Sequence, residues 1–176
     1  MSTGEKVPLH VAQAEADVLV EKLAPHCERI EVAGSIRRKR PMVGDIEIVC
    51  IPKAVMAGLF GDEQERSPDF EAVVDGMEAV KGSPDGKYTQ RITPLGTKLD
   101  LFMATFDNWG LILAIRTGSA DFSGKILAHR WKQLGYTSIG GVLHRGGEQT
   151  YVREERDLFD MLGIEWVDPE DREVAR

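Results

Sequence analysis

Apolar residues recur along the chain in two rhythms, one typical of helices and one typical of strands. In residues 8–23 they stand three to four positions apart, which predicts an amphipathic helix. Residues 29–32 and 44–51 instead alternate between apolar and polar side chains, as strands with one buried face do. In the second of these segments the alternation assigns Ile46, Ile48 and Cys50 to one face and Asp45, Glu47 and Val49 to the other.

The middle of the chain predicts a further series of helices and strands. Helices are expected at 53–60 and 69–80, the second capped by Asp69, with a polar loop between them. Strands are expected at 87–92 and 98–105, joined by a turn. In the last of these strands the alternation sets Leu99, Leu101 and Met103 against Lys98, Asp100 and Phe102.

The pattern changes after residue 107, where apolar and glycine-rich segments follow one another closely. The elements expected there are helices at 109–115, 121–134 and 154–162 and short strands at 136–144 and 149–152. A boundary near 106–108 therefore divides the chain into two predicted domains, 1–106 and 107–176. The order of strands and helices predicts the α+β fold class, with a small α/β unit in the second domain.

The composition indicates where the protein is expected to be and how it could bind nucleic acid, but it does not indicate which reaction it catalyses. Among 176 residues the net charge is −7, so a grip on nucleic acid is expected to be local. Two cysteines, Cys27 and Cys50, are too few for a disulfide framework or a Cys-rich zinc site. The sequence shows neither a signal-like apolar segment near Met1 nor an apolar run of membrane-spanning length. A cytoplasmic protein without membrane contact is expected, and its oligomeric state is left open.

Three acidic residues stand at strand positions where they would share one face. Asp45 and Glu47 are two residues apart in one predicted strand, and Asp100 lies in another. Carboxylates held side by side repel one another unless a cation neutralises them, and oxygen ligands suit magnesium. Alternate acids are also what the solvent-facing side of an ordinary strand contains, so both interpretations stay open.

A small turn precedes the acidic pair by about ten residues. Gly34 and Ser35 follow a predicted strand, and backbone N–H groups at such a turn are suited to an anion. The hydroxyl of Ser35 and an arginine of the basic run at 37–40 would add further donors. A phosphate cradle beside a divalent cation would suit a nucleoside triphosphate, whereas the basic run alone is equally typical of a solvated patch.

Several segments taken together resemble the DNA polymerase X (polymerase beta-like) family of the nucleotidyltransferase superfamily. They are residues 34–38, 43–49, 98–101 and 117–119 and the tail segments 155–163 and 168–172. The resemblance implies a nucleotidyltransferase palm, a mixed sheet with helices on one face, over 1–106 after a short N-terminal helix. It also implies a nucleotide-binding C-terminal subdomain over 107–176, and thus a minimal palm plus C-terminal architecture.

The same resemblance implies a role for each matching residue. Asp45, Glu47 and Asp100 would be catalytic and would hold two Mg²⁺ ions, for which Mn²⁺ could substitute. Asp100 would serve only the ion that activates the attacking hydroxyl. The residues implied to bind the substrate are Gly34, Ser35, Arg38, Lys98, Ile115, Arg116, Gly118, Ser119 and Ser123.

The chain departs from the family pattern at several of these positions. Glu47 replaces the usual aspartate, which matters because magnesium demands strict octahedral geometry. Arg116 stands where an aromatic residue screens the sugar, so a choice of deoxyribose over ribose is not implied. Ser123 replaces a base-contacting asparagine, and Leu127 replaces an arginine that template-directed members direct at the template.

The function predicted from the sequence is DNA polymerase X-like nucleotidyl transfer. The enzyme would add a nucleotide from a nucleoside triphosphate to the 3′-hydroxyl of a DNA primer or gapped duplex, as in short-gap repair. One alternative is a nucleotidyltransferase that uses a non-DNA acceptor, which the acidic composition favours slightly. The other is a nucleotide- or nucleic-acid-binding module without catalysis, against which the retention of all three acids argues.

Overall fold

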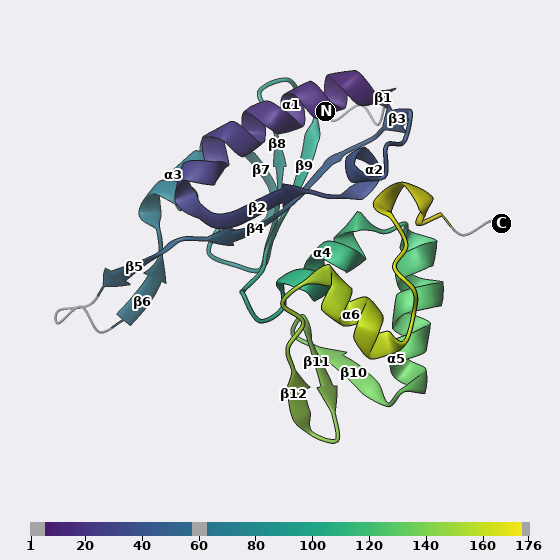
Figure 1. The fold of residues 1–176 in the computed structure, drawn as a ribbon. Coiled ribbons are helices and arrows are strands. Elements are labelled where there is room, and N and C mark those ends of the chain that lie inside the picture. Colours follow the sequence, from purple (N-terminus) through teal and green to yellow (C-terminus); the bar gives the residue numbers. More distant parts are fainter. Residues whose placement is uncertain (1–5, 58–62, 174–176) are drawn as a thin grey trace.

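A five-stranded sheet forms the centre of the computed structural model, which describes residues 6–57 and 63–173 (Figure 1). β4 and β9 are parallel and the other neighbouring strands are antiparallel, so the sheet is mixed. Together with the helices this confirms the predicted α+β fold class. In spatial order the strands are β2 (Cys27–Val32), β4 (Ile46–Pro52), β9 (Lys98–Met103), β8 (Tyr88–Ile92) and β7 (Glu78–Gly82).

One face of this sheet is covered by α1 (Leu9–Leu23) and α3 (Pro68–Asp75), as the ribbon shows (Figure 1). The predicted division of the strand faces is confirmed, because the apolar residues assigned to one face are buried under these helices. Removing this surface from water is the main source of stability for the layer. The core includes Ala12, Ala16, Leu19, Ile46, Ile48, Cys50, Phe70, Val74, Leu99, Leu101 and Met103.

The other face of the sheet is partly covered by α4 (Trp109–Thr117). Trp109 and Leu113 of this helix pack against Val49 and Phe102. The far side of α4 contributes to a second core, made with the helices and strands that follow it in the chain. Because α4 packs in both directions, it fixes the position of the C-terminal elements relative to the sheet face that carries the acids.

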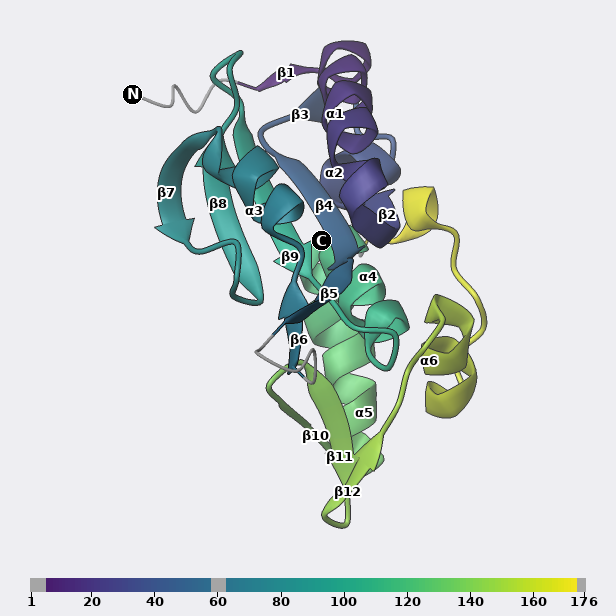
Figure 2. The ribbon, with the colours of Figure 1, turned by 90° about the vertical axis from the view of Figure 1, so that its left-hand side faces the viewer.

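The C-terminal elements surround the second core (Figure 2). The helix predicted at 121–134 is a continuous helical segment, but its first part, η2, is wound more widely than an α-helix. The last helix begins after Glu154, which forms a reciprocal cap with Asp157, and ends at Gly163 in a left-handed conformation. The elements are η2 (Phe122–Ala128), α5 (His129–Gln133), β10 (Tyr136–Ile139), β11 (Val142–Arg145), β12 (Glu148–Thr150), α6 (Glu155–Leu162) and η3 (Pro169–Asp171).

The predicted helix at 53–60 is wrong in the part that the structure describes. Residues Ala54–Ala57 form β5, which pairs with β6 (Glu63–Arg66) as an antiparallel ribbon. The rest of the predicted helix, 58–60, lies outside the described residues. The predicted polar loop is likewise strand where β6 lies. The two segments become strands because they pair with each other, and the hydrophobic pattern of neither segment alone indicates a strand.

Other predicted boundaries also change for non-local reasons. The helix predicted at 69–80 begins at Pro68 and ends at Asp75, with Ser67 rather than Asp69 at the capping position. The residues beyond it form the edge strand β7, paired with β8. The single strand predicted at 136–144 is a hairpin, β10 and β11, because two glycines with positive φ at 140–141 reverse the chain.

Several short elements were not predicted from the sequence. β1 (Val7–Pro8) pairs with β3 (Met42–Val43), and η1 (Ala24–His26) joins α1 to β2. The hydrophobic clusters lie on both sides of residue 107, and the domain boundary at 106/107 stays a prediction. Within the described ranges no helix is both long enough and apolar enough to cross a membrane.

Candidate active site

The sheet brings the three predicted acids to one place. The parallel register of β4 and β9 sets Glu47 beside Asp100. Asp45, predicted within the strand, lies in the bend just before β4, and its contact with Lys98, which also reaches Asp100, places it beside the other two acids. All three are on the face opposite to α1, at the end of the sheet where β4 begins.

The three carboxylates repel one another in the folded protein. Burial, followed by the charges of Asp45 and Asp100, raises the pKa of Glu47 to about 7, against the opposing effect of Arg38 and Arg116. The site therefore holds more negative charge than its own side chains neutralise. A cation bound there would relieve this repulsion.

The ammonium group of Lys98 lies between two of the acids. Its Nζ is 3.0 Å from Oδ2 of Asp45 and 3.8 Å from Oδ2 of Asp100. The hydrogen bond to Asp45 is the main reason that the pKa of Lys98 is raised. Among the residues that the structure describes, no three acidic, histidine or cysteine side chains are already arranged to hold a metal ion. Lys98 would have to move for a cation to bind both aspartates.

The other oxygen of Asp100 is bound to the neighbouring strand. The hydroxyl of Tyr88 donates to Oδ1 at 2.6 Å, and the side-chain amide of Gln90 donates to the same atom at 2.7 Å. Burial and then the bond to Asp100 raise the pKa of Tyr88 to about 12. Neither residue was predicted from the sequence to belong to the site. Their alternation with Ile92 shows that they share a face, but only the pairing of β8 with β9 sets them beside Asp100.

The glycine–serine turn lies against the acids. Gly34 begins the short helix α2 (Gly34–Arg37) with a φ of +59°. A Cβ atom at this position would be 1.9 Å from Oε2 of Glu47, so only glycine allows the carboxylate to lie this close. The Oγ of Ser35 is buried and has no hydrogen-bond partner within 6–57 and 63–173. An unpartnered donor beside the acids is suited to an incoming polar ligand.

Arg38 connects this turn to the C-terminal elements. Its guanidinium donates to the carbonyl of Thr117, and a Cβ at Gly118 would be 2.9 Å from its Nη1. The backbone N–H of Ser119 donates to the carbonyl of Arg172 at 3.0 Å. The structure thus brings two of the predicted substrate-binding segments, around Gly34 and Gly118, side by side.

The remaining predicted substrate-binding residues are less closely gathered. Arg116 is exposed, with its guanidinium 4.0 Å from the ring centre of Phe102 on β9. Ile115 packs against the second core. The hydroxyl of Ser123 donates to the carbonyl of Ile115 at 2.9 Å, so it is engaged within the helix pair. Leu127 is fully buried in the second core.

The basic run expected to meet phosphates is paired with acids of the C-terminal tail. Arg38 Nε is 3.0 Å from a carboxylate oxygen of Glu173, and Lys39 Nζ is 2.9 Å from one of Glu170. Arg40 is 3.6 Å from the same oxygen of Glu173. A phosphate that binds here would have to displace these carboxylates.

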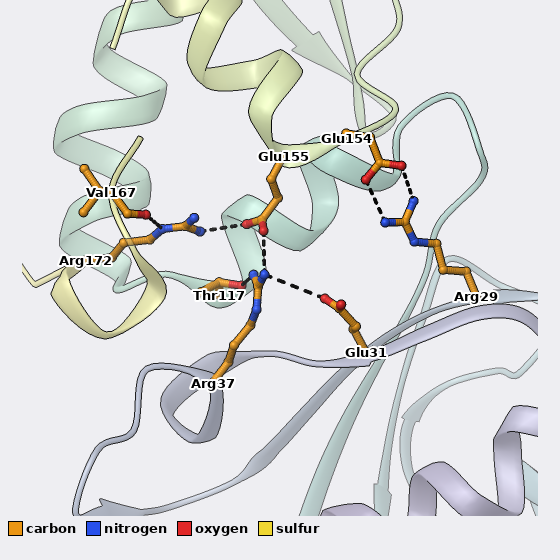
Figure 3. Close-up of polar contacts among 8 residues, drawn as sticks. All are labelled: Arg29, Glu31, Arg37, Thr117, Glu154, Glu155, Val167 and Arg172. Atoms are coloured by element: carbon orange, nitrogen blue, oxygen red, sulfur yellow. Dashed lines mark hydrogen bonds and ion pairs between the residues drawn. The ribbon is translucent and has the colours of Figure 1, made fainter. Parts of the chain in front are cut away.

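A second group of charged residues joins the sheet to the C-terminal elements (Figure 3). Arg37 donates to Glu155 and to Thr117, each at 2.6 Å, and the fully buried Arg172 donates to the other oxygen of Glu155 at 2.7 Å. The sequence pattern did not indicate these partners, since Arg37 and Glu155 are 118 residues apart. The remaining contacts are those of Arg29 with Glu154 at 2.6 and 2.7 Å and of Arg37 with Glu31 at 3.7 Å.

The fold and the grouped side chains define a small α+β protein with an acidic sheet face beside a glycine–serine turn. Residues 112–173, about a third of the chain, match the sequence profile of the family described as DNA polymerase beta thumb. This match supports a relationship to the polymerase beta-like X family. It includes Ile115, Arg116, Gly118, Ser119 and Ser123, whereas the three acids lie outside it. A comparison with curated proteins found no match for this chain.

Proposed function

We propose that the protein is a nucleotidyltransferase of the polymerase X type, which adds a nucleotide from a nucleoside triphosphate to a DNA 3′-hydroxyl. The observation that carries this proposal is the convergence of Asp45, Glu47 and Asp100 beside the Gly34–Ser35 turn. The profile match of residues 112–173 to a polymerase thumb supports it independently, because those residues lie outside the acidic strands.

The donor set of the acidic face fits a hard divalent cation. Asp45, Glu47 and Asp100 offer carboxylate oxygens only, which magnesium prefers. The pKa of Glu47 is raised first by burial and then by the charges of the two aspartates, which a bound cation would offset. Bound there, two Mg²⁺ ions would lower the pKa of the attacking hydroxyl and neutralise charge on the triphosphate. The acids would hold these ions once Lys98 gives up its contacts with them.

The other residues bind and orient the nucleotide. The free hydroxyl of Ser35 and the guanidinium of Arg38 would bind the outer phosphates, with Gly34 allowing close approach. Gly118 and Ser119 would lie along the sugar. Phosphoryl transfer asks little covalent chemistry of the protein, so positioning and charge account for most of the catalysis.

Three residues would lie on the sugar and base side of the nucleotide. Arg116 would lie toward the sugar from its place over Phe102, and it adds a charge where sugar selection would occur. Ile115 and Ser123 are held in the C-terminal core, so they would support the nucleotide side through the backbone rather than by contact with the base.

The test is an extension assay on the whole chain with each labelled nucleoside triphosphate in turn. The acceptors are single-stranded, primed and gapped DNA and RNA, with Mg²⁺ or Mn²⁺, and an Asp100→Asn variant serves as the inactive control. Extension of primed or gapped DNA by the wild type alone supports the proposal. Extension by Asp100→Asn at the wild-type rate contradicts it.

A non-DNA acceptor is a second candidate, and one observation favours it. The basic run that could meet a DNA backbone is already paired with Glu170 and Glu173, and the chain carries a net charge of −7. For this candidate, nucleotide binding persists in equilibrium titration while no nucleic acid of the panel is extended. A non-catalytic binding module would give the same pattern, and pyrophosphate release with small hydroxyl acceptors separates the two.

A further inference from the structure

Two residues of β8 bind Asp100 in a manner that selects one of its oxygens. The side chain of Asp100 is largely buried, with 8% of the residue exposed. Tyr88 and Gln90 both donate to Oδ1, at 2.6 and 2.7 Å. The contact that Lys98 makes with Asp100 is to the other oxygen, Oδ2. The carboxylate therefore has one oxygen turned to β8 and the other turned to Lys98.

The strand pairing makes this arrangement rigid. Gln90 lies directly opposite Asp100 in the antiparallel register, and Tyr88 lies opposite Phe102. The ring of Tyr88 stacks on that of Phe102, with centroids 5.0 Å apart, and the Gln90 amide also contacts the Tyr88 hydroxyl at 3.2 Å. A stacked ring and an opposed amide fix both donors before any ligand arrives.

A buried carboxylate needs hydrogen bonds, but this need alone does not explain the geometry. Satisfying the group would place donors on either oxygen, whereas both neutral donors here are on Oδ1. Asp45 also presents its Oδ2 to the same ammonium group as Oδ2 of Asp100. The two Oδ2 atoms thus face one position, which the ammonium group of Lys98 occupies.

We propose that Tyr88 and Gln90 are positioning residues that hold Asp100 with Oδ2 directed at the cation needed for activation of the acceptor hydroxyl. This inference rests on the proposed nucleotidyl transfer. It assigns a task to two residues outside the three acids and the nucleotide-binding segments. Neither side chain touches the reacting groups, so the effect of each passes through Asp100.

The test compares the double variant Tyr88→Phe/Gln90→Met with the wild type. The two changes nearly keep the size of the side chains and preserve the stack on Phe102, and they remove both donors to Asp100. The matched control is Tyr151→Phe/Gln133→Met, since Tyr151 and Gln133 are exposed and lie far from Asp100 in the sequence. Unfolding in urea verifies that all variants fold.

Binding of Mn²⁺ gives a readout that needs no catalysis. Free Mn²⁺ is followed by electron paramagnetic resonance as it is titrated into each protein. The Asp100→Asn variant gives the affinity that remains without the Asp100 carboxylate. The double variant is expected to bind Mn²⁺ about tenfold more weakly, because hydrogen bonds to charged groups contribute roughly this factor. The control is expected to bind as the wild type does.

Kinetics provide the second readout. kcat for primer extension is expected to decrease about tenfold while KM for the nucleotide stays unchanged, because Asp100 serves the hydroxyl side. Unchanged Mn²⁺ affinity and kcat in the double variant would overturn the inference while leaving the proposed function intact. If Asp100→Asn and Asp45→Asn both bind Mn²⁺ as tightly and with the same stoichiometry as the wild type, the acidic face is not a metal site and the proposed function itself fails.

Discussion

The acidic face of the sheet and the group of ion pairs in Figure 3 differ in how their charges are paired. We call this group the charged seam; it consists of Arg29, Glu31, Arg37, Glu154, Glu155 and Arg172. In the seam, three arginines meet three glutamates, and each charge has a partner of opposite sign. On the acidic face, Asp45 and Asp100 contact the ammonium group of Lys98. Within the described residues Glu47 forms no ion pair, and two arginines act on it from further away. The seam balances its charges and the acidic face does not.

The pKa values of two glutamates express this difference. The pKa of Glu154 is lowered, chiefly by its hydrogen bonds with Arg29, whereas that of Glu47 is raised to about 7 by burial and by neighbouring carboxylates. Unbalanced charge costs stability, and its presence on a well-packed sheet is consistent with the proposed ligand site. The paired charges of the seam instead hold the sheet and the C-terminal elements together.

The largest effect is expected where the acidic face loses a ligand charge. Asp45→Asn should reduce nucleotidyl transfer by roughly a thousandfold or more, because charge neutralisation in the transition state contributes several kcal/mol. The free energy of unfolding should change little, because the relieved repulsion with Glu47 offsets the weakened ion pair with Lys98. Single-turnover extension and urea unfolding measure the two quantities. Near-normal turnover would remove Asp45 from the site.

A substitution in the seam should reduce the stability of the protein rather than its activity. Glu155→Gln leaves Arg37 and the fully buried Arg172 without their carboxylate, which should cost about 4 kcal/mol of unfolding free energy. Glu154→Gln is the matched control, because its carboxylate is 57% exposed and its loss should cost less than about 1 kcal/mol. Equal losses in the two variants would contradict the distinction between a buried and an exposed pair.

The pH dependence of stability should sharpen the comparison. Folding raises the pKa of Glu47 from 4.5 to about 7, so the folded protein binds this proton more tightly than the unfolded chain. The resulting stabilisation is fully present below pH 4.5 and is lost as the pH rises through 7. Relative to Glu47→Gln, the metal-free wild type should lose about 3 kcal/mol between pH 4 and pH 8. The free energy of unfolding of both proteins is measured in urea across this range. If it changes with pH by the same amount in both, the raised pKa of Glu47 is refuted.

The site was predictable where its geometry follows from a single strand or turn. Alternation assigned Asp45 and Glu47 to one face, and the two-residue period also assigned the face of Asp100. The sequence did not indicate that Tyr88 and Gln90 bind Asp100, because antiparallel register is set by a partner strand. The ribbon of β5 and β6 was missed for the same reason.

Partners far apart in sequence were the least predictable. A run of basic residues at 37–40 predicts either a phosphate site or a solvated patch, but the acids that pair with it lie more than a hundred residues later. Their position depends on Arg172, whose burial among aromatic rings and against Glu155 anchors the tail. No periodicity within either segment contains this information.

The smallest effect, a change in nucleotide affinity, is expected at Arg38, which lies near the acidic face and also pairs with an acid of the C-terminal tail. The carboxylate of Glu173 is 3.0 Å from Arg38 and would compete with a phosphate for it. Glu173→Gln should tighten binding of a fluorescent nucleoside triphosphate about two- to fivefold at low salt, because exposed ion pairs contribute less than about 1 kcal/mol. Glu165→Gln removes the same charge from an exposed position of the same segment and should change the affinity less. If both variants bind alike, the gain comes from net charge alone, and Glu173 does not compete with the nucleotide for Arg38.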